Sequence, residues 1–217
     1  MRRKMDSWER IVSVNEDLIK ANERLADENK NFFKNKGIIA IEVLGNIGSG
    51  KTSLIAKVIE KLKTKYHIAV INGDIAGDPA DIARIGVPTI QINTGGECHL
   101  DAKYIRPFVE KLPKETNLCF IENVGNLICP FEFPLGCSHR VVVVALTDGP
   151  FIIRKHPVTF RIATIAVINK IDMKKFLDND PKQLVKDCQG INPKAAVVLT
   201  SAKTGEGIQD LIKAMNL

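Results

Sequence analysis

A phosphate-binding loop is the feature that most constrains how this chain folds. GNIGSGKT at residues 45–52 fits the pattern G-x-x-x-x-G-K-T and follows IIAIEVL, an apolar run typical of a buried strand. Small residues let backbone N–H groups surround a phosphate, while the lysine reaches the outer phosphates and the threonine ligates Mg²⁺. SLIAKV then predicts a helix whose N-terminal end favours anions. The expected triphosphate-binding residues are Gly45, Asn46, Gly48, Ser49, Gly50, Lys51, Thr52 and Ser53.

Two downstream motifs indicate that the nucleotide is GTP. NKID at residues 169–172 ends a predicted strand. Guanine presents two parallel N–H donors, which adenine lacks, and the carboxylate of Asp172 can accept both. Lys170 would lie along the base, and the Asn169 amide would hold the loop and contact the base edge. A companion loop, with a backbone N–H directed at the guanine oxygen, is expected at Ser201, Ala202 and Lys203.

Apolar runs alternate with helical stretches along the chain. Further strands are predicted at residues 66–71, 87–92, 118–121, 141–146, 164–168 and 195–199. This alternation is typical of an α/β protein with a doubly wound, mostly parallel sheet, here the P-loop NTPase fold. The charged segment before Gly37 predicts one long helix or two shorter ones, packed on the core or on a partner, or exposed. We therefore expect an N-terminal helical extension at 1–36 and a P-loop GTPase domain at 37–217.

Acidic residues at two strand ends are candidate magnesium ligands. Asp74 and Glu122 both follow predicted strands, at the edge where ligands of open α/β sheets gather. Carboxylates there hold Mg²⁺ directly or through its waters. We expect Thr52, Asp74 and Glu122 to bind magnesium. The predicted catalytic residues are Lys51, Asp74 and Glu122.

The segment ENVG at residues 122–125 has the spacing of the D-x-x-G switch of GTPases. Its glycine, Gly125, can contact the γ-phosphate through its N–H. Asn126 follows where many GTPases place a water-positioning glutamine, so we expect slow intrinsic hydrolysis. Asp81 either acts in the switch or simply begins a helix.

Cys98, His99 and Cys129 form a candidate metal site. Thiolate and imidazole ligands suit Ni²⁺ or Zn²⁺. Cys98-His99 follows a Gly-Gly turn, and Cys129 lies in the switch-like loop of residues 123–139. Loops of that length in compact domains are usually functional or disordered, although a cysteine is often merely a small buried residue. Weaker candidates, supported by no family pattern, are Cys137 and His139.

Composition favours a cytoplasmic protein that binds neither nucleic acid nor membrane. The 31 Lys and Arg are scattered among 25 Asp and Glu, so the formal charge of +6 indicates a solvated surface. No apolar run is long enough for a bilayer span, and the initial MRRK precedes charged residues. Five cysteines, an odd number, indicate reduced thiols.

Together these motifs resemble the HypB family, the nickel-incorporation GTPases of [NiFe]-hydrogenase maturation. ECHLDA at 97–102, IENVGNLICP at 121–130 and the phosphate loop carry the resemblance. It runs from about residue 18 to the C-terminus, and IKANERLA at 19–26 is similar to the family's leading helix. The related urease accessory GTPases, UreG, share the phosphate loop but have a Cys-Pro-His motif.

The resemblance implies a GTPase of the SIMIBI class that dimerises with GTP bound face to face. It also implies that Cys98, His99 and Cys129 bind nickel or zinc at the dimer interface. The implied partners are the accessory protein HypA and the hydrogenase large subunit. The Cys-Cys-x-x-Cys motif and His-rich tract of some members do not occur here, so nickel storage is not expected. DGPF at 148–151 and Asp78-Pro79 also depart from the family pattern.

Three other functions remain open at this stage. A urease-type nickel accessory GTPase would share the phosphate loop. A signalling or assembly GTPase would use its cysteines only structurally. A P-loop kinase with Glu122 as its base is disfavoured by the guanine-reading motif.

Overall fold

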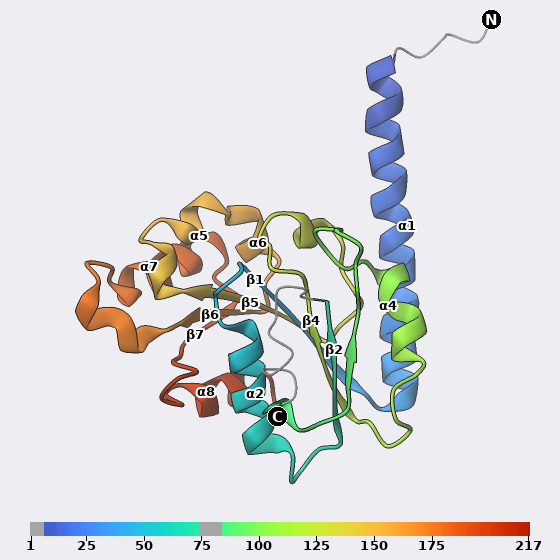
Figure 1. Cartoon of the computed structure of the whole chain (residues 1–217). Helices are drawn as coiled ribbons and strands as arrows, with labels where there is room; N and C mark the ends of the chain where they lie inside the picture. The colour runs from blue at the N-terminus through green and yellow to red at the C-terminus, as the bar shows by residue number, and fades with distance from the viewer. Residues whose placement is uncertain (1–6, 74–83) are drawn as a thin grey trace, which may run out of the picture.

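A computed structural model describes residues 7–73 and 84–217 (Figure 1). Within them, seven strands form one parallel sheet in the order β3-β2-β4-β1-β5-β6-β7, which confirms the predicted doubly wound α/β fold. The strands are β1 Ile39–Gly45, β2 Ile68–Asn72, β3 Thr89–Gln91, β4 Leu118–Glu122, β5 His139–Ala145, β6 Ile165–Asn169 and β7 Ala196–Leu199. The α-helices are α1 Ser7–Lys36, α2 Lys51–Leu62, α4 Ala102–Val109, α5 Ile152–Lys155, α6 Pro157–Arg161, α7 Pro181–Ile191 and α8 Ile208–Ala214. Short 3₁₀ helices are η1 Cys129–Glu132, η2 Leu146–Asp148 and η3 Ile171–Phe176.

The two faces of the sheet carry separate hydrophobic clusters, because side chains alternate along each strand. Ile41 and Val43 of β1 pack with α2 and α8 on one face. On the other face, Ala40 packs with residues of α1 and α4, and Leu44 packs with residues of α5, α6 and α7. The central strands are covered on both faces, which explains their nearly continuous apolar sequences.

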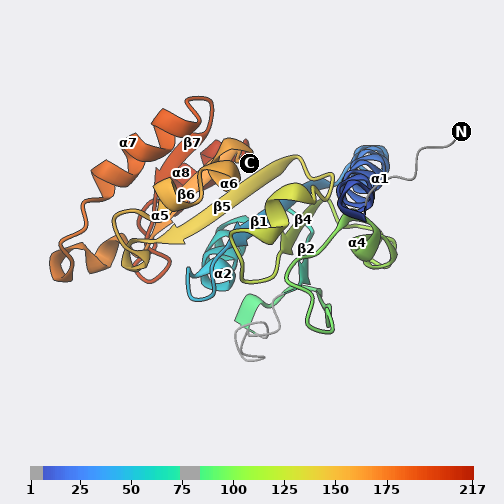
Figure 2. The ribbon, with the colours of Figure 1, turned by 90° about the horizontal axis from the view of Figure 1, so that it is seen from above.

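Helix α1 is one 30-residue helix whose second half packs on the domain beside α4. Phe33 is buried among residues of the sheet and α4. The buried amide of Asn22 donates to the Pro134 carbonyl at 3.0 Å and accepts from the Ala102 N–H at 2.8 Å. Figure 1 shows the N-terminal turns of α1 extending beyond the body, and Figure 2 places α1 beside α4 at one end of the sheet and α7 at the other. No helix among the described residues combines the length and apolarity needed to cross a membrane.

The predicted strand at residues 87–92 is shorter in the structure. Strand β3 begins at Thr89 because the preceding residue, Pro88, has no N–H to donate to the ladder. Helix α4 ends at Val109, and tighter turns follow, in which the Leu112 N–H donates to the Val109 carbonyl at 3.3 Å. Neither feature moves a candidate site residue.

Candidate nucleotide and metal sites

The phosphate loop joins β1 to α2 at the carboxyl edge of the sheet, as the sequence predicts. Lys51 Nζ lies 3.1 Å from the carbonyl oxygens of both Gly45 and Asn46. Gly50 caps α2 with a left-handed φ of 90°, and a Cβ there would lie 2.5 Å from the Asn169 amide nitrogen. Glycine is therefore required here both for its backbone conformation and for close packing.

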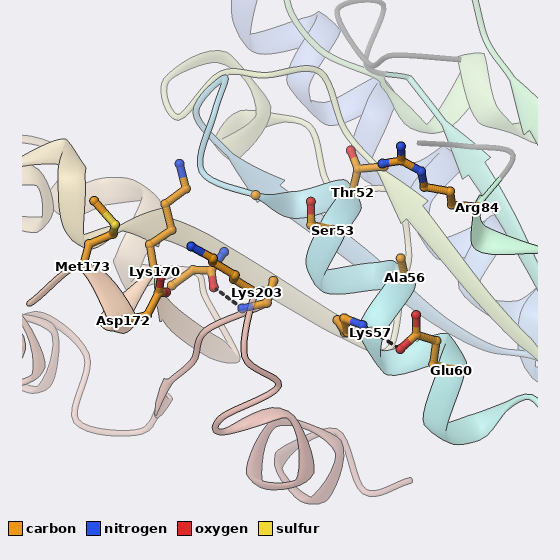
Figure 3. A pocket seen from close by; sticks show the side chains of 13 residues that line it. Thr52, Ser53, Ala56, Lys57, Glu60, Arg84, Lys170, Asp172, Met173 and Lys203 are labelled. Atoms are coloured by element: carbon orange, nitrogen blue, oxygen red, sulfur yellow. Dashed lines mark hydrogen bonds and ion pairs between the residues drawn. The ribbon is translucent and has the colours of Figure 1, made fainter. Parts of the chain in front are cut away.

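A cavity of about 500 Å³ lies beside the loop, within the usual size range of small-molecule sites. Figure 3 shows Thr52 and Ser53 of α2 on one side and Lys170, Asp172 and Lys203 on the other. The predicted phosphate-binding and guanine-reading segments thus line one cavity, although up to about 150 residues separate them in the sequence.

Asn169 joins the phosphate loop to the segment after β7. Its Nδ2 donates to the Ser49 carbonyl at 2.9 Å, and its Oδ1 accepts from the Ala202 N–H at 3.1 Å. Ser201 Oγ donates to Asp172 Oδ1 at 2.6 Å, which orients the carboxylate. The predicted holding role of Asn169 thus has a structural basis, while Asp172 lines the cavity.

The cavity also contains residues that the motifs did not predict. Figure 3 shows Lys57 and Glu60, joined by a 2.9 Å ion pair, and the Arg84 side chain extending toward Thr52. Helical spacing could have identified two residues, because positions four and eight after Thr52 share its face of α2. The full set of unpredicted lining residues is Ala56, Lys57, Glu60, Arg84 and Met173.

Two candidate magnesium ligands meet at the start of α2. Thr52 Oγ1 donates to Glu122 Oε1 at 2.8 Å, and Glu122 is the buried last residue of β4. A hydroxyl and a carboxylate are the hard oxygen donors that Mg²⁺ prefers. The third candidate, Asp74, lies outside the described residues, as do Asp78, Pro79 and Asp81.

The switch-like segment lies directly on the phosphate loop. Asn126 forms an antiparallel bridge with Gly45, and a side chain on Gly125 would collide with Ile47. The Asn126 side chain contacts the cysteine segments, since its Oδ1 accepts from the Ile128 N–H at 2.8 Å and its Nδ2 lies 3.5 Å from the Cys98 carbonyl. The sequence placed Asn126 where many GTPases have a water-positioning glutamine, and it did not predict these contacts with the cysteine segments.

The structure brings the three metal-ligand candidates together. Cys98 Sγ lies 3.5 Å from His99 Nδ1, and the interaction of its thiol with the neighbouring Cys129 side chain raises the pKa of Cys98, with burial adding to the effect. Burial lowers the pKa of His99, which favours the neutral imidazole that binds metals. The His99 ring stacks on Phe133 at a centroid distance of 4.1 Å. Two thiols and one imidazole form a donor set that suits nickel or zinc.

The three donors are not arranged as a finished metal site. Across the part of the chain that the structure describes, no group of three or more His, Cys, Asp or Glu side chains has the arrangement needed to hold a metal ion. Cys137 and His139 do not join the three donors, because Cys137 packs beside the α1–α4 cluster and His139 interacts with the Met215 backbone. A metal would therefore require rearranged side chains or a donor from another chain.

Thiol modification should separate the cysteines into two classes at pH 8. Cys98 is exposed and Cys129 half-buried, whereas burial raises the pKa of Cys119 to about 12 and that of Cys188 to about 11. Because the thiolate is the nucleophile and the Cys119 and Cys188 sulfurs are also fully buried, we expect these two residues to react at least about a hundredfold more slowly than Cys98 with a disulfide reagent. Mass mapping of the modified cysteines checks the assignment, and rapid labelling of Cys119 or Cys188 in the folded protein would contradict it.

Comparisons with known proteins agree with these motifs. Residues 39–199 match the family model described as the CobW/HypB/UreG nucleotide-binding domain. A probable hydrogenase maturation factor HypB of Methanocaldococcus jannaschii is 44% identical over 94% of this chain and 93% of its own length.

Two solved structures share both fold and sequence. The hydrogenase maturation factor HypB of Archaeoglobus fulgidus superposes with a TM-score of 0.86 and 38% identity, covering 91% of this chain and 98% of its own. HypB of Helicobacter pylori, solved in complex with nickel, superposes with a TM-score of 0.82 and 28% identity over 90% and 95% of the two chains. The chain therefore belongs to the HypB family of hydrogenase maturation factors, GTPases of the CobW/HypB/UreG group.

Proposed function

We propose that this protein is a GTP-hydrolysing metallochaperone that delivers nickel during [NiFe]-hydrogenase maturation. The observation that carries the proposal is the position of Cys98 and Cys129, whose thiols meet beside a switch-like segment lying on the phosphate loop. Nucleotide chemistry and metal binding would thus share one structural segment. The resemblance to a HypB solved with nickel supports nickel as the metal, and zinc would compete for the same donors.

GTP would bind across the cavity of Figure 3. Asp172 would accept the two guanine N–H groups, and Gly125 would approach the γ-phosphate. Lys51 would exchange the carbonyl oxygens it now contacts for phosphate oxygens. Thr52 and Glu122, with Asp74, would hold Mg²⁺, which supplies positive charge to the transferring phosphoryl group.

A GTP-dependent homodimer would complete the metal site. Ile47 and Ile128 are 70% and 60% exposed, and they lie next to the switch-like segment and to Cys129 respectively. Exposed apolar side chains beside incomplete metal donors favour an interface there.

Nickel and GTP affinities would then be coupled, and each ligand must alter the affinity of the other by the same factor. HypA as metal-exchange partner and the hydrogenase large subunit as recipient complete the proposal.

Replacing both Cys98 and Cys129 with alanine is expected to weaken nickel binding by about a hundredfold, because both thiolate donors are lost. A nickel titration followed by sedimentation, with GDP and with a non-hydrolysable GTP analogue, measures affinity, stoichiometry and dimerisation together. The matched control is Cys188→Ala, which removes a buried thiol of α7 from the hydrophobic cluster that contains Leu44. Unchanged nickel affinity in the double variant would refute the metal-delivery role and leave a signalling or assembly GTPase.

A further inference from the structure

A buried carboxylate, Glu42, lies in the middle of β1 on the face opposite α2. Its neighbours on that face, Ala40 and Leu44, belong to two different hydrophobic clusters. Arg140, on the adjacent strand β5, is its register partner, and Arg140 Nε lies 2.8 Å from Glu42 Oε2. The second oxygen, Oε1, accepts from Asn123 Nδ2 at 2.9 Å. Glu42 therefore joins Arg140 and Asn123 in one buried network.

Each partner of Glu42 holds the backbone next to a candidate metal ligand. The terminal nitrogens of Arg140 donate to the carbonyls of Pro130 at 2.6 Å and Phe131 at 3.2 Å, immediately after Cys129. Asn123 Oδ1 accepts from the Leu100 N–H at 2.9 Å, immediately after His99. The network thus fixes the backbone of both ligand-bearing segments relative to β1.

The same network begins at the nucleotide site. Asn123 directly follows Glu122, whose carboxylate accepts from Thr52 at the start of α2. Asn123 Oδ1 also accepts from the Val124 N–H at 2.9 Å, one residue before Gly125. Any displacement of residues 122–125 on nucleotide binding would therefore move the Asn123 amide.

We infer that Glu42, Asn123 and Arg140 are positioning residues that set the spacing between Cys98-His99 and Cys129 and transmit the nucleotide state to them. The inference rests on the proposed metal site. Stability alone does not explain a buried ion pair, because apolar residues of similar volume often replace one without loss. A planar guanidinium, in contrast, can bind one carboxylate and two carbonyls in fixed directions.

Arg140→Lys tests this role while keeping the positive charge beside Glu42. An ammonium lacks the planar fork, so it cannot reproduce all three contacts of Arg140. We expect nickel to bind about tenfold more weakly, the usual cost of removing a partner that orients a metal ligand. The ratio of nickel affinities with GTP analogue and GDP should also fall toward one. Arg154→Lys is the matched control, because Arg154 makes a two-point ion pair with Asp187 that joins α5 to α7.

A second variant keeps the test informative if Arg140→Lys fails to fold. The double change Glu42→Gln with Arg140→Met removes both charges of the ion pair together, so the buried Glu42 carboxylate is not left uncompensated. Nickel alone is titrated into each full-length variant, and thiolate-to-nickel charge-transfer absorption reports the ligand geometry. Thermal unfolding and GTP-analogue affinity are measured on the same samples. We expect the spectrum and the nickel affinity to change in both Arg140 variants and not in Arg154→Lys.

The inference is overturned if the folded Arg140 variants keep the wild-type nickel affinity, absorption spectrum and affinity ratio. A wild-type affinity ratio of one would overturn the transmission role. These outcomes differ from failure of the proposed function, in which nickel binding survives the loss of Cys98 and Cys129.

Discussion

Replacing Lys51 with alanine is expected to lower the rate of GTP hydrolysis by about a thousandfold, the usual upper cost of removing one preorganised charge-stabilising group. Lys51 Nζ already lies at the mouth of the phosphate loop, 3.1 Å from two loop carbonyls. Catalysis of phosphoryl transfer depends on positioning and electrostatics rather than on a covalent intermediate, so no other step compensates for the lost charge of Lys51. Phosphate release under single-turnover conditions measures the effect directly.

Lys57→Ala is the matched control for this prediction. Lys57 is also a lysine of α2 that lines the cavity, but it forms an exposed ion pair with Glu60 one turn beyond the loop. We expect it to change hydrolysis only a few-fold, because exposed pairs contribute little. If Lys51→Ala hydrolysed GTP as fast as Lys57→Ala, the phosphate loop would not be the catalytic site.

The fold could be predicted closely because its signals are local. Each central strand is a short apolar run covered on both faces, and each crossover begins or ends near glycine, proline or a capping residue. The proximity of Asp172 and Ser201 was equally predictable, because the two residues follow two adjacent parallel strands. Parallel strands necessarily deliver their carboxyl ends to one edge of the sheet.

The proposed metal site depends on contacts that no local pattern contains. The Cys98 and Cys129 side chains interact although 31 positions separate them in the sequence, and sequence spacing alone does not specify that contact. The contacts of Asn126 with the two cysteine segments are likewise not specified by sequence spacing. Glu42, however, left a visible signal, since a carboxylate inside an apolar strand is buried and must be paired. Its partners Asn123 and Arg140 could be identified only from the structure.

Asp172→Asn is expected to weaken GTP binding by about a thousandfold, because two hydrogen bonds to a carboxylate contribute roughly 1.5–3 kcal/mol each. The asparagine oxygen can keep the hydrogen bond that Ser201 donates at 2.6 Å, and the amide NH₂ then faces the base. The asparagine NH₂ is itself a donor, so it cannot accept hydrogen bonds from the two N–H groups of guanine. Xanthine carries an oxygen in place of the exocyclic amine, so xanthosine triphosphate should gain the affinity that GTP loses. Competition binding with both nucleotides measures the change.

Asp178→Asn provides the same chemical change at a neighbouring exposed carboxylate and should leave GTP preferred over xanthosine triphosphate.

The Asp172→Asn variant also tests whether the nucleotide site and the proposed metal site are coupled. If nucleotide occupancy controls the cysteine site through residues 122–126, nickel affinity in Asp172→Asn should respond to a xanthosine triphosphate analogue and no longer to a GTP analogue at the same concentration. A nickel response that still followed GTP would place guanine recognition elsewhere. If the variant still bound xanthosine triphosphate but its nickel affinity responded to neither nucleotide, nucleotide binding at the phosphate loop would not be coupled to the metal site.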